Sequence, residues 1–159
     1  MNTLLLFRHS DAENSRGRDA DRQLTLRGRE KIQLIAGHAK EIESKIDIIL
    51  SSPLIRARQT SEIISGVYGI DPKKIVELDE LAEGFPSEFI RLLKEYSGKN
   101  IVCVGHMPSI VYLATGLTSG SNFPIGFSFF TGQFIVLDFK GKYLPQRGVI
   151  KYIYKEEAF

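Results

Sequence analysis

The strongest constraint on the fold is a predominantly apolar run over residues 3–7, which ends abruptly at Arg8 and His9. A continuous run of this kind, without alternation of polar and apolar residues, is typical of a strand that is buried on both faces. In open α/β sheets, ligands bind beyond the carboxyl ends of the strands. The sequence therefore predicts a central strand that delivers an arginine and a histidine to a site.

Apolar strands and amphipathic helices alternate along the rest of the chain. Further strands are predicted over residues 46–50, 75–78, 101–104, 133–139 and 149–154. Helices are predicted over residues 26–43, 53–67, 87–96 and 108–117. Thr25 is the expected N-cap of the first helix, and Pro53 suits the first position of the second. This alternation predicts the α/β class, as a three-layer α/β/α sandwich with helices on both faces of a mostly parallel sheet.

Composition limits the function classes that the chain can serve. With 159 residues, 43% of them hydrophobic, residues 1–159 are expected to form a single domain with a substantial core. The net charge of +2 favours neither a nucleic-acid partner nor a membrane partner. The single cysteine, Cys103, excludes an internal disulfide and is expected to be a buried small hydrophobe. A cytoplasmic protein is expected, because no stretch approaches the ~20 apolar residues of a membrane span and no secretory signal is visible.

Positively charged and titratable side chains recur where the predicted parallel strands end. Arg8 and His9 follow the first strand, Arg56 lies in the first turns of the helix after the second, and His106 follows residues 101–104. Parallel strands bring these ends to one edge of the sheet. Arginine presents a planar fork that pairs with phosphate oxygens, and a neutral imidazole can act as a nucleophile. The four residues predict an oxyanion pocket, most economically one for a phosphoryl group.

Each of these residues also has a simpler interpretation when taken alone. A histidine at a strand end is often only a hydrogen-bonded structural residue, and His38 is expected at the surface of a helix. Arg56 alone would be a solvated helix residue, as Arg58 is expected to be, because residues two apart project to different faces. Zinc binding by His9 and His106 lacks a third ligand at a suitable spacing. The coincidence at several strand ends is what favours a functional site, and no metal or cofactor is expected in it.

Four segments occur in a characteristic order, namely Leu6–Ala12, Arg22–Gly28, Ser51–Thr60 and Val104–Pro108. Together they resemble the motifs of the histidine phosphatase superfamily, the branched family of phosphoglycerate mutases and phosphatases. The short chain is most similar to the phosphohistidine phosphatases of the SixA type. The resemblance implies a phosphoglycerate mutase-like fold and a metal-independent hydrolase acting on phosphoryl groups. One departure is visible, since Ser10 stands where the family usually has glycine.

The resemblance also implies a role for each matching residue. His9 would be the nucleophile that becomes a phosphohistidine intermediate, which water then hydrolyses. Arg8, Arg56 and His106 would bind the phosphoryl oxygens, in agreement with the electrostatic character of phosphoryl-transfer catalysis. Ser15, in the following loop, would add a hydroxyl donor.

The proton donor and the substrate stay open at this point. Glu80 matches the acid of the family's mutases and phosphomonoesterases best, Glu83 is the alternative, and both also fit solvated loop residues. Imidazole is a far better leaving group than an alcohol, since its conjugate acid has a pKa of roughly 6.5. An uncertain acid therefore favours a phosphorylated protein, such as a histidine-phosphotransfer domain, as the partner. A small phosphate ester is the alternative substrate, and a non-catalytic phosphate-binding module is the alternative function.

A mixed-charge loop follows the predicted nucleophile. Arg16 and Arg18 lie in it, and they either form a solvated rim or steer an acidic phosphoprotein toward the pocket.

Overall fold

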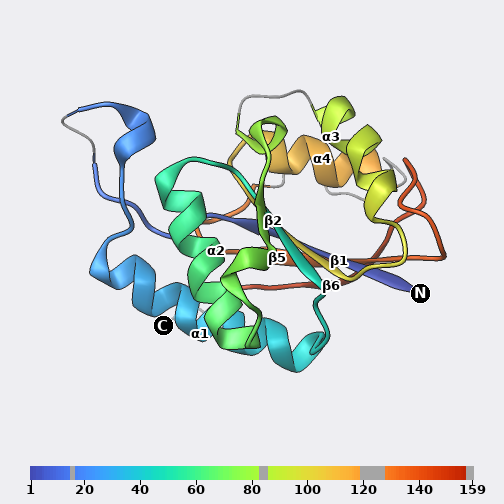
Figure 1. Ribbon diagram of the computed structural model, residues 1–159, viewed down its shortest axis with the longest axis horizontal. Coiled ribbons are helices and arrows are strands. Elements are labelled where there is room, and N and C mark those ends of the chain that lie inside the picture. Colours follow the sequence, from blue (N-terminus) through green and yellow to red (C-terminus); the bar gives the residue numbers. More distant parts are fainter. Residues whose placement is uncertain (15–16, 83–85, 119–127, 157–159) are drawn as a thin grey trace.

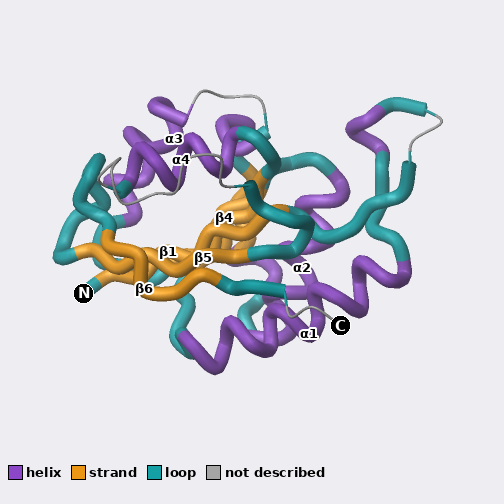
Figure 2. The backbone as a smooth tube through the Cα atoms, turned by 180° about the vertical axis from the view of Figure 1, so that it is seen from behind, coloured by secondary structure: helices purple, strands orange, loops and turns teal. Residues whose placement is uncertain are grey.

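A six-stranded sheet forms the middle layer of the computed structural model, which describes residues 1–14, 17–82, 86–118 and 128–156 (Figures 1 and 2). The strands, in spatial order, are β3 (Ile75–Glu77), β2 (Ile48–Ser51), β4 (Ile101–Gly105), β1 (Asn2–Arg8), β5 (Phe134–Phe139) and β6 (Val149–Ile153). The first four of these are mutually parallel. β5 is antiparallel to β1, and β6 is antiparallel to β5. The sheet is therefore mixed, with a parallel half that carries the strand ends singled out above.

Helices cover both faces of this sheet, as Figure 1 shows. α1 (Leu26–Ile42) and α2 (Ile55–Tyr68) lie on one face, and α3 (Pro86–Leu93) and α4 (Ser109–Leu117) lie on the other. The connections between these elements contain short 3₁₀ helices, labelled η1 (Asp19–Asp21), η2 (Pro72–Lys74), η3 (Asp79–Leu81) and η4 (Lys94–Tyr96). The predicted three-layer α/β/α architecture is confirmed. Within the described residues, no helix combines the length and apolar character that crossing a membrane requires.

β1 is the interior strand that the apolar run predicts. Leu4 and Leu6 pack into the core beneath α3 and α4, whereas Leu5 and Phe7 pack into the core beneath α1 and α2. All four side chains are fully buried. Successive side chains of a strand point to opposite faces, so a strand covered by helices on both sides is apolar along its middle. The polar residues of β1, Asn2, Thr3 and Arg8, lie toward its two ends.

The helix starts show which local signals hold in the structure. Thr25 is the N-cap of α1, as predicted, and its side chain accepts a hydrogen bond from the Gly28 N–H at 2.9 Å. The prediction for Pro53 is wrong, because α2 begins at Ile55. The hydroxyl of Ser52 accepts a hydrogen bond from the Leu54 N–H at 3.2 Å, and Leu54 is extended, so residues 53 and 54 precede the helix.

Candidate active site

The register of the parallel strands brings the two candidate histidines together. Arg8 pairs with Gly105 across β1 and β4, and the N–H of His9 donates to the Gly105 carbonyl at 3.0 Å. His106 is the next residue of the chain, and its ring centroid lies 5.1 Å from that of His9. Both histidines are buried. The end of the apolar run and a strand almost a hundred residues later thus supply one pair of imidazoles.

Arg56 reaches the same place from the first turn of α2. Its side chain is buried, and its charge acts on Arg8, His9 and His106. Both terminal nitrogens of its guanidinium bind η1: Nη1 donates to the Asp19 carbonyl at 3.0 Å, and Nη2 lies 3.1 Å from the Asp19 carboxylate. The far end of the guanidinium is therefore held by Asp19, which fixes the direction of its Nε edge.

The backbone after β1 sets the orientation of the His9 ring. His9 Nδ1 lies 2.7 Å from the Ser10 carbonyl, which can only accept, so Nδ1 carries the hydrogen and Nε2 holds the lone pair. The Ser10 N–H donates to Thr60 Oγ1 at 3.1 Å, and the Ser10 hydroxyl donates to the Gly28 carbonyl at 2.8 Å. Serine is accommodated at this usually glycine position because its φ is not positive.

Gly28 lets the chain that follows His9 lie directly against α1. A Cβ atom at this position would lie 2.1 Å from the Asp11 carbonyl oxygen, far inside any real contact. The same carbonyl accepts the Thr25 N–H at 3.1 Å. Gly28, within the second motif, therefore contributes to the site indirectly, because it lets residues 10 and 11, which follow His9, pack against α1.

Burial keeps both imidazoles uncharged near neutral pH. It lowers the pKa of His9 to about 4, and the cationic Arg56 and Arg8 contribute to the same shift. Burial also lowers the pKa of His106 to about 3, together with the neighbouring His9 and Arg56. The pKa of Arg8 is lowered by burial as well. A neutral histidine beside two guanidinium groups is suited to attack an electrophile that carries negatively charged oxygens.

Three buried side-chain nitrogens in the described part of the chain have no hydrogen-bond partner, and all of them belong to this cluster. They are Nε of Arg8, Nε of Arg56 and Nδ1 of His106. A buried polar group without a partner costs roughly 1–3 kcal/mol, so such groups at a functional site indicate a ligand that satisfies them. Two of the three nitrogens are permanent donors of cationic side chains, which suits an anion with several oxygens.

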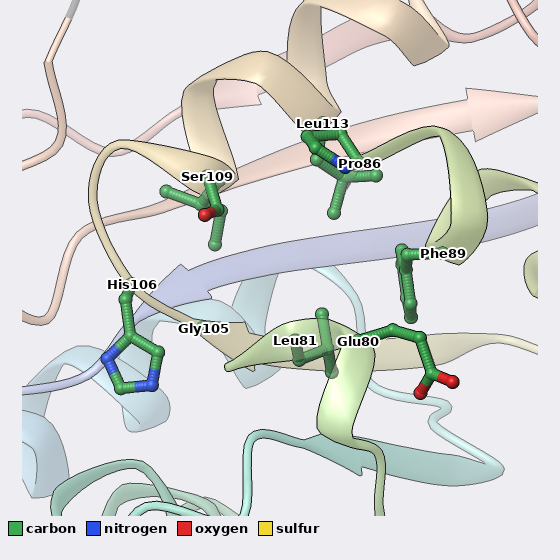
Figure 3. A pocket seen from close by; sticks show the side chains of 9 residues that line it. Glu80, Leu81, Pro86, Phe89, Gly105, His106, Ser109 and Leu113 are labelled. Carbon is green, nitrogen blue, oxygen red and sulfur yellow. The ribbon is translucent and has the colours of Figure 1, made fainter. Parts of the chain in front are cut away.

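A small pocket adjoins His106, and Glu80 of η3 lies on its wall (Figure 3). Most of the lining is apolar, with Leu81, Phe89 and Leu113 among its residues. The Glu80 carboxylate is turned away from the His106 ring in Figure 3. The structure therefore brings Glu80 to the same pocket as His106 but does not direct its carboxylate at the histidine pair.

Some of the predicted residues are less well placed or lie outside the description. Ser15, Arg16 and Glu83 lie outside the described residues. Arg18 is exposed and lies 3.6 Å from Asp21 in an ion pair, at the rim of the molecule. Within the described ranges, no three histidine, cysteine, aspartate or glutamate side chains group as metal ligands would.

Comparison with known protein families identifies the family of the chain. Residues 4–87, more than half of the chain, match the family model of the histidine phosphatase superfamily, branch 1. The chain belongs to the histidine phosphatase superfamily. The predicted family and the predicted class of enzyme, a hydrolase of phosphoryl groups, are confirmed.

Individual members of the superfamily resemble the chain along most of its length. Phosphohistidine phosphatase SixA of Escherichia coli is 28% identical over 126 residues, which cover 77% of this chain and 78% of that protein. A structure of the protein histidine phosphatase SixA complexed with tungstate superimposes with a TM-score of 0.83 at 23% identity, covering 94% of each chain. A phosphoserine phosphatase of Entamoeba histolytica, in complex with 3-phosphoglyceric acid, has a TM-score of 0.70 at 20% identity and covers 99% of this chain and 98% of its own.

Two residues of this superfamily member were not predicted from the sequence. Asp19 binds Arg56, and Arg22 lies 3.2 Å from the Asp19 carboxylate while its charge also acts on His9 and Arg8. The Arg22 hydrogen bond lowers the pKa of Asp19, with Arg56 as a second cause. Arg22 opens the second motif, and this was the signal that it contributes to the site. Nothing in the sequence connects Asp19 with an arginine 37 positions later.

Proposed function

We propose that this protein is a metal-independent phosphatase that acts through a phosphohistidine intermediate on Nε2 of His9, and that its substrate is phosphohistidine in a protein. The observation that carries the proposal is the cluster of three unpartnered buried nitrogens beside a histidine whose lone pair is at Nε2. Arg8 and Arg56 supply the positive charge, and His106 supplies a neutral polar group.

The reaction proceeds in two displacements. In the first, Nε2 of His9 forms a bond to phosphorus while the bond between phosphorus and the substrate's imidazole nitrogen breaks. The nitrogen of the leaving imidazole takes up a proton from solvent or from an acid. In the second, a water oxygen attacks phosphorus, the bond to Nε2 breaks, and inorganic phosphate leaves. Fixed donors aimed at the equatorial oxygens stabilise both transition states.

The position of Glu80 favours phosphohistidine over an alcohol ester. An alkoxide needs a proton as it leaves, whereas imidazole is a good leaving group at neutral pH. A carboxylate turned away from the histidine pair is poorly placed for the first task and is not needed for the second. The similarity to phosphohistidine phosphatase SixA over most of both chains supports the same choice.

A small-molecule phosphomonoesterase is the second candidate. The observation in its favour is that Glu80 and His106 line the same pocket. A phosphoserine phosphatase also shares this fold.

The test compares a phosphorylated histidine-phosphotransfer domain with p-nitrophenyl phosphate and 3-phosphoglycerate, in the presence of a chelator. We expect the highest kcat/KM with the phosphoprotein and a labelled, acid-labile phosphoenzyme that His9→Ala abolishes. His38→Ala, which changes an exposed histidine, is the matched control and should retain the label. Glu80→Gln should leave phosphoprotein hydrolysis within about twofold of wild type. Preference for the esters, together with a loss of about 100-fold in Glu80→Gln, would establish the phosphomonoesterase instead.

A further inference from the structure

The fully buried hydroxyl of Ser52 lies against the ring of His106. β2 pairs Ser51 with Val104, and the Ser52 N–H continues this ladder by donating to the Val104 carbonyl at 3.0 Å. Residue 52 is therefore level with the end of β4, where His106 follows. Ser52 Oγ lies 2.7 Å from Nε2 of His106, and both groups are buried.

The two partners of this hydroxyl together determine the direction of the hydrogen bond. The Leu54 N–H lies 3.2 Å from Ser52 Oγ, and a backbone N–H can only donate. If His106 Nε2 also donated to this oxygen, the buried hydroxyl hydrogen would have no acceptor in the described part of the chain, so the hydroxyl donates to Nε2 of His106. A ring nitrogen that accepts a hydrogen bond carries the lone pair, which leaves the single hydrogen of a neutral imidazole on Nδ1.

The surroundings of the ring agree with this direction. Burial first, and then His9 and Arg56, keep the pKa of His106 at about 3, so the ring is neutral near pH 7 and has one N–H. Nδ1 is the buried ring nitrogen without a partner. With the hydrogen on Nε2 instead, Nδ1 would present a lone pair to a site that binds the oxygens of an anion, and the two would repel.

We propose that Ser52 is a positioning residue, whose hydroxyl holds His106 as the Nδ1–H tautomer so that this ring donates to a phosphoryl oxygen. The two histidines then share one tautomer but present opposite edges to the site. His9 presents the lone pair of Nε2, because the Ser10 carbonyl takes its Nδ1–H, and His106 presents its Nδ1–H, because Ser52 takes its Nε2. The identity of the bound oxygen rests on the proposed function, whereas the tautomer does not.

The tautomer is measured by long-range ¹H–¹⁵N correlation spectra of the ¹⁵N-labelled protein at pH 7 with inorganic phosphate present. The chain has three histidines, so the spectrum is simple to assign with His9→Ala and His38→Ala. We expect His106 to be the Nδ1–H tautomer in wild type and in Ser52→Thr, and to gain the Nε2–H tautomer in Ser52→Ala. Ser51→Ala is the matched control. It removes a buried hydroxyl one residue away that bonds Ser61 and the Ser52 carbonyl, and it should keep the wild-type tautomer.

Kinetics provide the second readout. Ser52→Ala should lower kcat about 10- to 100-fold at little changed KM, the usual effect of removing a group that orients a site residue, and Ser52→Thr should restore activity. An Nε2–H tautomer of His106 in wild type, or an unchanged tautomer in Ser52→Ala, would overturn the proposal. A wild-type protein that hydrolyses no phospho-compound would overturn the proposed function, and the spectra would still decide the role of Ser52.

Discussion

Lowering the pH from 7 to 5 is expected to destabilise the folded protein, because the fold holds two histidines uncharged that the unfolded chain protonates. Burial above all lowers the pKa of His9 to about 4 and that of His106 to about 3. An unfolded histidine has a pKa of about 6.5. At pH values between the folded and the unfolded pKa of each histidine, the unfolded state binds more protons than the folded state. The free energy of unfolding therefore falls as the pH falls through this range.

The size of the effect follows from the unfolded pKa. At pH 5, about 30 of every 31 unfolded histidines are charged, which stabilises the unfolded chain by about 2 kcal/mol per residue. At pH 7 the same quantity is about 0.2 kcal/mol. Between pH 7 and pH 5, His9 and His106 together therefore lower the free energy of unfolding by about 4 kcal/mol, against a typical total stability of 5–15 kcal/mol. Since both folded pKa values lie below 5, the result depends little on how far below they lie.

Urea unfolding at the two pH values, in buffers without phosphate or sulfate, measures this loss. We expect His9→Gln and His106→Gln each to lose about half of the pH dependence at an unchanged m-value, and His38→Gln, at an exposed histidine, is the matched control variant. A wild-type loss below about 1 kcal/mol, or full pH dependence in both variants, would refute the assignment of buried neutral imidazoles.

Two further changes test how the site is built. Gly28→Ala forces a Cβ against the Asp11 carbonyl oxygen, so we expect urea unfolding to show a loss of about 2–4 kcal/mol, together with lower activity. Gly37→Ala, in the same helix with nothing within 4 Å of the added Cβ, should instead gain up to about 1 kcal/mol, and equal losses in both would contradict the close approach. Inorganic phosphate at about 100 times its Kd should stabilise the wild type by about 2.7 kcal/mol in thermal unfolding. Arg56→Met should lose this stabilisation, and a wild-type Tm that phosphate leaves unchanged would contradict an anion site.

Local sequence signals predicted the strand β1 and the start of α1 correctly, but they did not predict the start of α2. The unbroken apolar run of β1 indicated a strand buried on both faces, and Leu4 to Phe7 are indeed divided between the two cores. Thr25 predicted a helix start because capping is decided within three residues. Pro53 predicted a helix start that is two residues too early. The Ser52 hydroxyl accepts a hydrogen bond from the Leu54 N–H, and α2 begins only at Ile55. A competing side-chain hydrogen bond of this kind is not visible in a helix propensity.

By itself, the sequence determined the candidate residues and their order. Arg8, His9, Arg56 and His106 each stand at the end of a strand or the start of a helix, and periodicity and chain order reveal such positions. Only the tertiary structure decided how their polar atoms are used. In the structure, Arg56 is hydrogen-bonded to Asp19, His9 to the Ser10 carbonyl and His106 to the Ser52 hydroxyl. A hydrogen bond depends on the positions of two particular atoms to within tenths of an ångström. Strand register and close packing set those positions, because they bring together residues that are far apart in the chain.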